Sequence, residues 1–192
     1  MHQPERAERI PHGSLSAPRG ARLCKAFGGY WVVLVRKMMN VGVFEVRTKD
    51  GFVGMVSPLS HELVFKKGMP EKAVFGTVPA GTDRILPSNF TANPTFIEFL
   101  QGFVAEHMPS LMAFVQEARR LGDGHVYLID YRTPDVHGDV PPEDILGVFE
   151  VKSGEPVSYE TNPNYRLFTE RGFFVLHPEL EARLLAEIEG LQ

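Results

Sequence analysis

The chain has 192 residues, of which 43% are hydrophobic and 23% charged, with a formal net charge of -4. A chain of this length is typical of one globular domain, and it can bury roughly 70% of its unfolded surface without metal or disulfide cross-links. The sequence pI near 6.0 argues against nucleic-acid binding, because proteins of that class usually carry a basic stripe and a pI above about 9.

The compartment follows from the cysteine count and the hydropathy pattern. The single cysteine, Cys24, cannot form an internal disulfide, which is typical of a reducing compartment. The N-terminus lacks the apolar segment of a secretory signal, and no apolar run approaches the ~20 residues that span a membrane. We therefore expect a cytoplasmic protein, and its rich use of Ala, Arg, Gly and Pro favours a bacterial source.

Residues 1–22 contain three prolines, two glycines and four arginines but few large apolar side chains. Such a segment cannot bury enough surface to offset its ordering entropy. It is expected to form a flexible N-terminal arm, or an arm that folds on a partner subunit. Residues 23–192 are expected to form a single α+β domain.

The pattern becomes typical of β-strands at residue 30. Residues 30–35 and 41–47 are rich in β-branched and aromatic side chains, and Asp50-Gly51 is a strong hairpin signal before a third strand over 52–56. These three segments predict a meander.

The pentapeptide Gly-Val-Phe-Glu-Val occurs twice, at residues 42–46 and 147–151. Each copy is followed by a basic residue and a turn of small residues, and each is preceded by a β-rich run. This pattern indicates duplicated strand units around 30–56 and 124–157, although strand sequences also converge by chance. In the first copy, Phe44 and Val46 are expected to share one face, and Val43 and Glu45 the other.

Residues 57–93 are rich in proline and glycine, with short strands expected over 63–65 and 73–78. Asn93 and Pro94 then begin the clearest helix, whose apolar residues recur with helical spacing to His107. Ser110 can cap a second helix that Gly122 ends. A central helical pair is therefore predicted over about 94–121.

The remaining elements follow in order along the chain. A strand over 124–131 precedes a polar loop over 132–144, and a hairpin is expected around 170–172 before a C-terminal helix over about 178–190. Because strands, helices, strands and a helix occur in that order, we predict an α+β fold with an antiparallel or mixed sheet of about six to eight strands.

The polar loop holds the richest set of candidate ligands. Asp135, His137 and Asp139 alternate, so in an extended loop they would point the same way and could hold a divalent cation. His137 could also act as a general base, with Asp130 or Asp139 orienting it. A small metal-assisted or acid/base hydrolase is therefore one interpretation, although no Gly-x-Ser-x-Gly elbow or P-loop accompanies these residues.

The segment 162–166 combines amide, aromatic and guanidinium groups, which suit a carboxylate or a flat ligand. An Asn-Pro turn followed by a strand would explain the same residues.

The absence of catalytic and cofactor motifs favours a different interpretation, a non-catalytic binding domain without a cofactor. It would recognise a protein partner or a small ligand through the 132–144 loop, and a homodimer is one arrangement open to such a module. The residues expected to bind are Arg132, Asp135, His137, Asp139, Asn164, Tyr165 and Arg166.

Overall fold

The computed structural model describes residues 23–25, 31–33, 40–49, 51–134 and 138–191. Its contacts divide the chain into two units, residues 1–37 and 38–192. The expected arm over 1–22 lies outside the described residues. None of the described helices is both long and apolar enough to cross a bilayer.

In the first unit, β1 (Leu23–Lys25) pairs antiparallel with β2 (Trp31–Val33). The predicted meander is therefore wrong in its first pairing, because β2 pairs with β1 and not with the strand after residue 41. The short connection between β1 and β2 explains this outcome, since hairpin loops of two to about five residues are the commonest.

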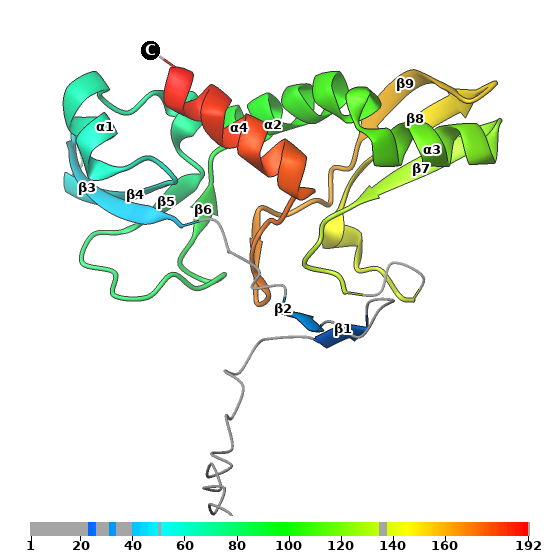
Figure 1. Cartoon of the computed structure of the whole chain (residues 1–192). Helices are drawn as coiled ribbons and strands as arrows, with labels where there is room; N and C mark the ends of the chain where they lie inside the picture. The colour runs from blue at the N-terminus through cyan, green and yellow to red at the C-terminus, as the bar shows by residue number, and fades with distance from the viewer. Residues whose placement is uncertain (1–22, 26–30, 34–39, 50, 135–137, 192) are drawn as a thin grey trace, which may run out of the picture. The chain divides into compact units, whose positions relative to one another are not determined.

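The second unit contains two larger antiparallel sheets and a small hairpin (Figure 1). The first sheet has the order β3 (Gly42–Thr48), β4 (Gly51–Ser57), β5 (Gly76–Pro79) and β6 (Thr91–Ala92). The second has the order β7 (Gly124–Ile129), β8 (Ile145–Lys152) and β9 (Glu155–Thr161). The hairpin predicted around 170–172 is confirmed as β10 (Phe168–Thr169) and β11 (Gly172–Phe173).

Three long helices complete this unit: α2 (Pro94–His107), α3 (Met112–Leu121) and α4 (Pro178–Gly190). They confirm the central pair, the C-terminal helix and the α+β class. Asn93 caps α2 as predicted, since its side-chain oxygen accepts the N–H of Thr95. The Ser110 cap is wrong: its hydroxyl donates to the carbonyl of His107 in the 3₁₀ turn η2 (Met108–Ser110).

The short strand expected over 63–65 is also wrong, because these residues lie in helix α1 (His61–Lys67). Local signals in the chain explain the helix. The hydroxyl of Ser60 accepts the N–H of Leu63, and Glu62 pairs with Lys66 at 2.6 Å across one turn.

Both copies of the pentapeptide are strands with the expected alternation. Phe149 and Val151 of β8 are buried, and Phe44 and Val46 of β3 are half-buried. The copies differ in position, since β3 lies at the edge of its sheet and β8 lies in the centre. Their origin by duplication of 30–56 and 124–157 stays a prediction.

A closer correspondence joins β4-β5-β6 to β7-β8-β9. Each central strand has a glycine that pairs with both neighbours: Val56↔Gly76↔Ala92 in one sheet and Leu128↔Gly147↔Thr161 in the other. The residues one position after each glycine also pair with both neighbouring strands in the same way. The two triplets therefore share one register.

The residues after the third strand match too. The side-chain amide of Asn93 donates to the carbonyl of a residue in the 3₁₀ turn η1 (Glu71–Ala73) and to that of Val74. The side-chain amide of Asn162 does the same with the 3₁₀ turn η3 (Pro142–Asp144) and Ile145. A proline follows each asparagine. In both sheets, an asparagine side chain at the matching position therefore fixes the start of the central strand.

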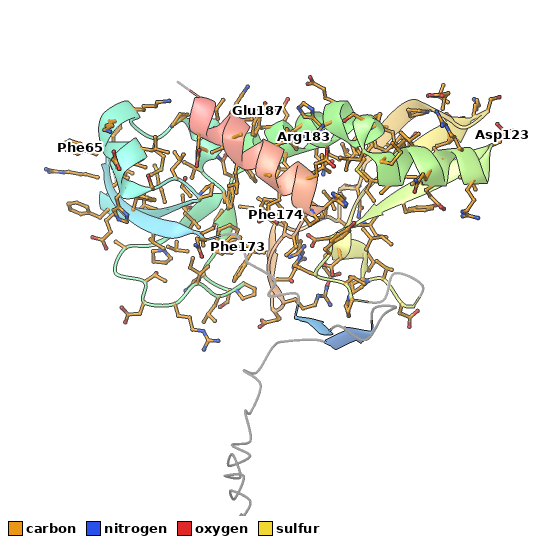
Figure 2. All side chains as sticks on the ribbon, in the orientation of Figure 1. Phe65, Asp123, Phe173, Phe174, Arg183 and Glu187 are labelled. Carbon is orange, nitrogen blue, oxygen red and sulfur yellow. The ribbon has the colours of Figure 1, made fainter. Side chains whose placement is uncertain are left out.

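An aromatic cluster packs the first sheet against the helices. Phe75, Phe96 and Phe174 are all buried, with ring centroids 4.4 Å, 5.3 Å and 5.9 Å apart. Figure 2 shows Phe174 near the centre of this unit, between its two larger sheets. Leu180, Leu184 and Ile188 form the buried stripe of α4 that joins this core.

The shared glycines give a stability test. A Cβ at Gly147 would lie 2.5 Å from the carbonyl oxygen of Glu160, and one at Gly76 would lie 2.3 Å from that of Thr91. Alanine at either position should lower the free energy of unfolding by about 1–3 kcal/mol, because backbone cannot move aside easily. Gly102→Ala is the control, since open space surrounds it in α2 and alanine there should add about 0.5–1 kcal/mol. Urea unfolding measures the free energy of unfolding of each variant. If Gly147→Ala left that free energy unchanged, the register would be contradicted.

Candidate functional site

The described members of the predicted binding set differ in burial. Arg132 and Tyr165 are buried, whereas Asp139, Asn164 and Arg166 are exposed. Asp135 and His137 lie outside the described residues. The structure thus brings Arg132 and Tyr165 together in the interior, and they meet there with Asp130.

Arg132 is the centre of a buried charge cluster. Its Nη2 lies 2.9 Å from Oδ2 of Asp130 and 3.3 Å from Oδ1 of Asp144, and both carboxylate side chains are fully buried. The guanidinium also donates to the carbonyls of Arg166 and Gly172. These contacts occupy Nη1 and Nη2, while Nε is buried without a hydrogen-bond partner. The side chain is only 1% exposed, so Arg132 holds the structure together and is not presented on the surface.

Asp130 connects β7 to a distant segment of the chain. Its Oδ1 accepts the backbone N–H groups of Arg132 and Val175, both at 2.9 Å. Its own N–H donates to the carbonyl of Asp144 on the β8 side. Burial raises the pKa of Asp130, and the Arg132 guanidinium and the two N–H donors oppose that rise.

Tyr165 completes the cluster from the opposite direction. Its hydroxyl donates to Oδ2 of Asp130 at 3.2 Å. Burial, reinforced by the negative charge of Asp130, raises the pKa of the Tyr165 phenol well above its ordinary value. The groups that contact the Asp130 carboxylate all donate to it, which fits an ionised carboxylate.

A metal site remains a prediction. Within the part of the chain that the structure describes, no three His, Cys, Asp or Glu side chains gather closely enough to hold an ion. Two of the three proposed ligands, Asp135 and His137, are outside that part.

The structure shows a different candidate site, an apolar pocket of about 240 Å³ beside strand β7. Its walls come from α2, α3 and the start of α4, and its floor comes from β7. The apolar side chains that line the pocket include Val104, Met108, Phe114, Leu128, Leu146 and Leu180.

The pocket lies at the edge of the sheet. It is lined by the successive residues Val126, Tyr127, Leu128 and Ile129. Neighbouring side chains of a strand point to opposite faces, so a pocket that touches all of them borders the strand's edge. Among the described residues, no strand pairs with this edge of β7 over 124–129.

The direction of the backbone groups along β7 follows from its flanking bonds. The carbonyl of Gly122 and the N–H of Asp130 bond toward the β8 side, whereas the N–H of Tyr131 donates to Val175 on the other side. Because these directions alternate along a strand, the N–H and C=O of Tyr127 and Ile129 face the free edge.

Aromatic groups form the rim of the pocket. Tyr127 is 60% exposed and Tyr131 is 38% exposed. The rings of Tyr131 and His177 lie 6.0 Å apart in an edge-to-face arrangement, and Nδ1 of His177 accepts the N–H of Glu179 as the cap of α4. The Asp130 cluster therefore positions the rim, because Tyr131 follows Asp130 directly and bonds to Val175.

A second hollow, of about 580 Å³, lies between α2 and β9. Its main polar groups bond to one another: Tyr159 donates to the side chain of Gln101, which donates to the carbonyl of Leu146. These groups are already satisfied, so the pocket beside β7 is the stronger candidate.

Sequence reasoning identified β7 as a strand but missed the pocket. The usable signal was the run Val126-Tyr127-Leu128-Ile129, whose aromatic residue falls on the face opposite the core. The charged residues of the following loop are a weaker guide, because Asp130 and Arg132 bond internally.

No protein-family model, curated protein or solved structure matches this chain. The functional argument therefore depends on the geometry of the site.

The charge cluster gives a stability prediction. Arg132→Met should lower the free energy of unfolding by about 3–5 kcal/mol, because it leaves the buried Asp130 carboxylate without its cation and removes one of the two cations of Asp144, which also pairs with Arg171 at 2.7 Å. Arg166→Met is the matched control: that residue is exposed, so its effect should stay within about 0.5 kcal/mol. If urea unfolding gave the same loss of free energy for Arg132→Met and Arg166→Met, Arg132 would not be the centre of the cluster.

The raised pKa of Tyr165 gives a pH prediction. The unfolded chain releases the phenol proton near the ordinary pKa of about 10, whereas the folded protein retains it, so stability should fall as pH rises above that value. Tyr165→Phe should weaken this dependence. Urea unfolding at several alkaline pH values measures it, and simultaneous ionisation of all five tyrosines near pH ~10 in the folded protein would contradict it.

Proposed function

We propose that this protein is a non-catalytic interaction module that binds an extended segment of a partner polypeptide along the free edge of β7. The observation that carries the proposal is the apolar pocket beside an unpaired edge strand. In this mode of recognition, backbone hydrogen bonds supply affinity and a side-chain pocket supplies specificity.

The first sheet supplies a pattern for the bound segment. There β3 pairs antiparallel with β4, and Val43 lies opposite Val56. Val56 corresponds to Leu128 in the shared register. A segment added to β7 in the manner of β3 would therefore place one side chain opposite Leu128.

That side chain would enter the pocket. Residues opposite each other in an antiparallel pair point to the same face, and the side chain of Leu128 is buried in the pocket floor. The pocket suits a small aliphatic side chain, because Phe114 and Val104 form its nearby walls.

The 132–144 loop takes part through its ends. Tyr131 stands at the rim just before the loop, and the Arg132 cluster fixes the loop's first turn. The exposed Asp139 is the described loop residue that could contact the partner. The hydrolase alternative gains no support from Asp130, whose carboxylate is buried and bonded to four donors.

The test uses a labelled peptide with the sequence of β3, residues 42–48, and fluorescence anisotropy. Tyr127→Pro removes an edge-facing N–H and should weaken binding at least about tenfold, or about 1.4 kcal/mol. Tyr127→Thr retains that N–H and should bind within about threefold of the parent, a difference of less than 1 kcal/mol. Filling the pocket from the exposed Ala113 with Ala113→Trp should also weaken binding.

Absence of peptide binding, or equal binding by the proline and threonine variants, would refute strand addition at β7. Binding that Ala113→Trp abolishes but Tyr127→Pro leaves intact would indicate a small-ligand pocket instead.

A further inference from the structure

We infer that the partner segment is β7 of a second copy of this chain, so that two copies pair antiparallel through this edge. The inference rests on the proposed function and names the partner. It joins two three-stranded sheets into one continuous sheet across a two-fold axis.

The first argument is the composition of the sheet edges. Natural edge strands carry charged residues or proline that prevent pairing with other copies, or they are very short. The described edges follow this rule, since β3 carries Glu45 and Arg47, β9 carries Pro156 and Glu160, and β6 has two residues. The segment over 124–129 has no Lys, Arg, Asp, Glu or Pro, so β7 alone among them is unprotected.

The second argument is self-complementarity. Tyr127 has its N–H and C=O directed to the free edge, so two copies of it can exchange both hydrogen bonds across the two-fold axis. Val126 then lies opposite Leu128 of the other copy, and His125 lies opposite Ile129. No like charges meet, and the two exposed Tyr127 rings form a cross-strand aromatic pair.

The third argument is the fit of the pocket. In this register Val126 of one copy is the residue opposite Leu128 of the other, and it points to the face where the pocket lies. Its small aliphatic side chain matches the pocket walls. The pairing would also cover the exposed Tyr127, and it ends before Tyr131, whose N–H already bonds to Val175.

The short ladder sets the expected strength. Stable dimers bury more than about 1,000 Å² in total, and one strand pair with two small pockets lies at the low end of that range. We therefore expect a dissociation constant of about 1–100 µM for the dimer. Sedimentation equilibrium of the full chain under reducing conditions, which exclude a Cys24 disulfide, should show the mass rise from 21.5 kDa toward twice that value as concentration increases.

Substitutions at the symmetric position provide the decisive test. Tyr127→Lys and Tyr127→Glu should each stay monomeric, because like charges meet on the two-fold axis, whereas an equimolar mixture of the two should dimerise. Val157→Lys places the same charge at an exposed position on the β9 edge and should dimerise like the parent. Circular dichroism checks that the variants fold.

A parent chain that stays monomeric to about 200 µM, about twice the highest dissociation constant expected, would overturn the self-pairing. So would a lysine–glutamate mixture that fails to associate. If that monomer still binds the 42–48 peptide in a Tyr127-dependent manner, the proposed strand addition stands and only the second copy is wrong. If the peptide also fails to bind, both proposals fall.

Discussion

The second sheet of this protein depends on one buried carboxylate. Asp130 accepts hydrogen bonds from Arg132, Tyr165 and Val175, and its backbone bonds to Asp144. Segments far apart in the sequence therefore meet at one charged group that is fully removed from water. A buried charge is tolerated only when it is paired and hydrogen-bonded, so the end of β7, the start of β8 and the chain before α4 hold a fixed arrangement.

That arrangement explains why a binding site can lie beside the cluster without including it. The charged residues form a rigid support, and the apolar residues of β7 and the surrounding helices form the surface. The first sheet has the same strand register but carries Ser57 at the end of β4, where its hydroxyl donates to the carbonyl of Ala73. In that sheet β3 covers the edge, whereas no described strand pairs with the corresponding edge of β7.

Much of the fold could be predicted from local signals. Asn93-Pro94 and Pro178 begin helices because they suit helix N-termini, and the β10–β11 hairpin follows from its turn residues. Long-range facts could not be predicted this way. Nothing local shows that β2 pairs with β1, or that Arg132 points inward, because its burial also depends on Asp144 and on the carbonyls of Arg166 and Gly172 farther along the chain. Chemical type predicts the candidate residues in the polar loop but does not report their burial.

The connectivity of the Asp130 cluster has a consequence for biosynthesis. Strands β7 and β8 leave the ribosome well before residues 165–175, which supply the phenol, carbonyls and amide that complete the cluster. Until those residues emerge, Asp130 lacks the donors Tyr165 and Val175, and Asp144 lacks Arg171, so both carboxylates favour hydration over burial. The nascent second sheet should therefore remain loosely packed, and its completion should await the last part of the chain.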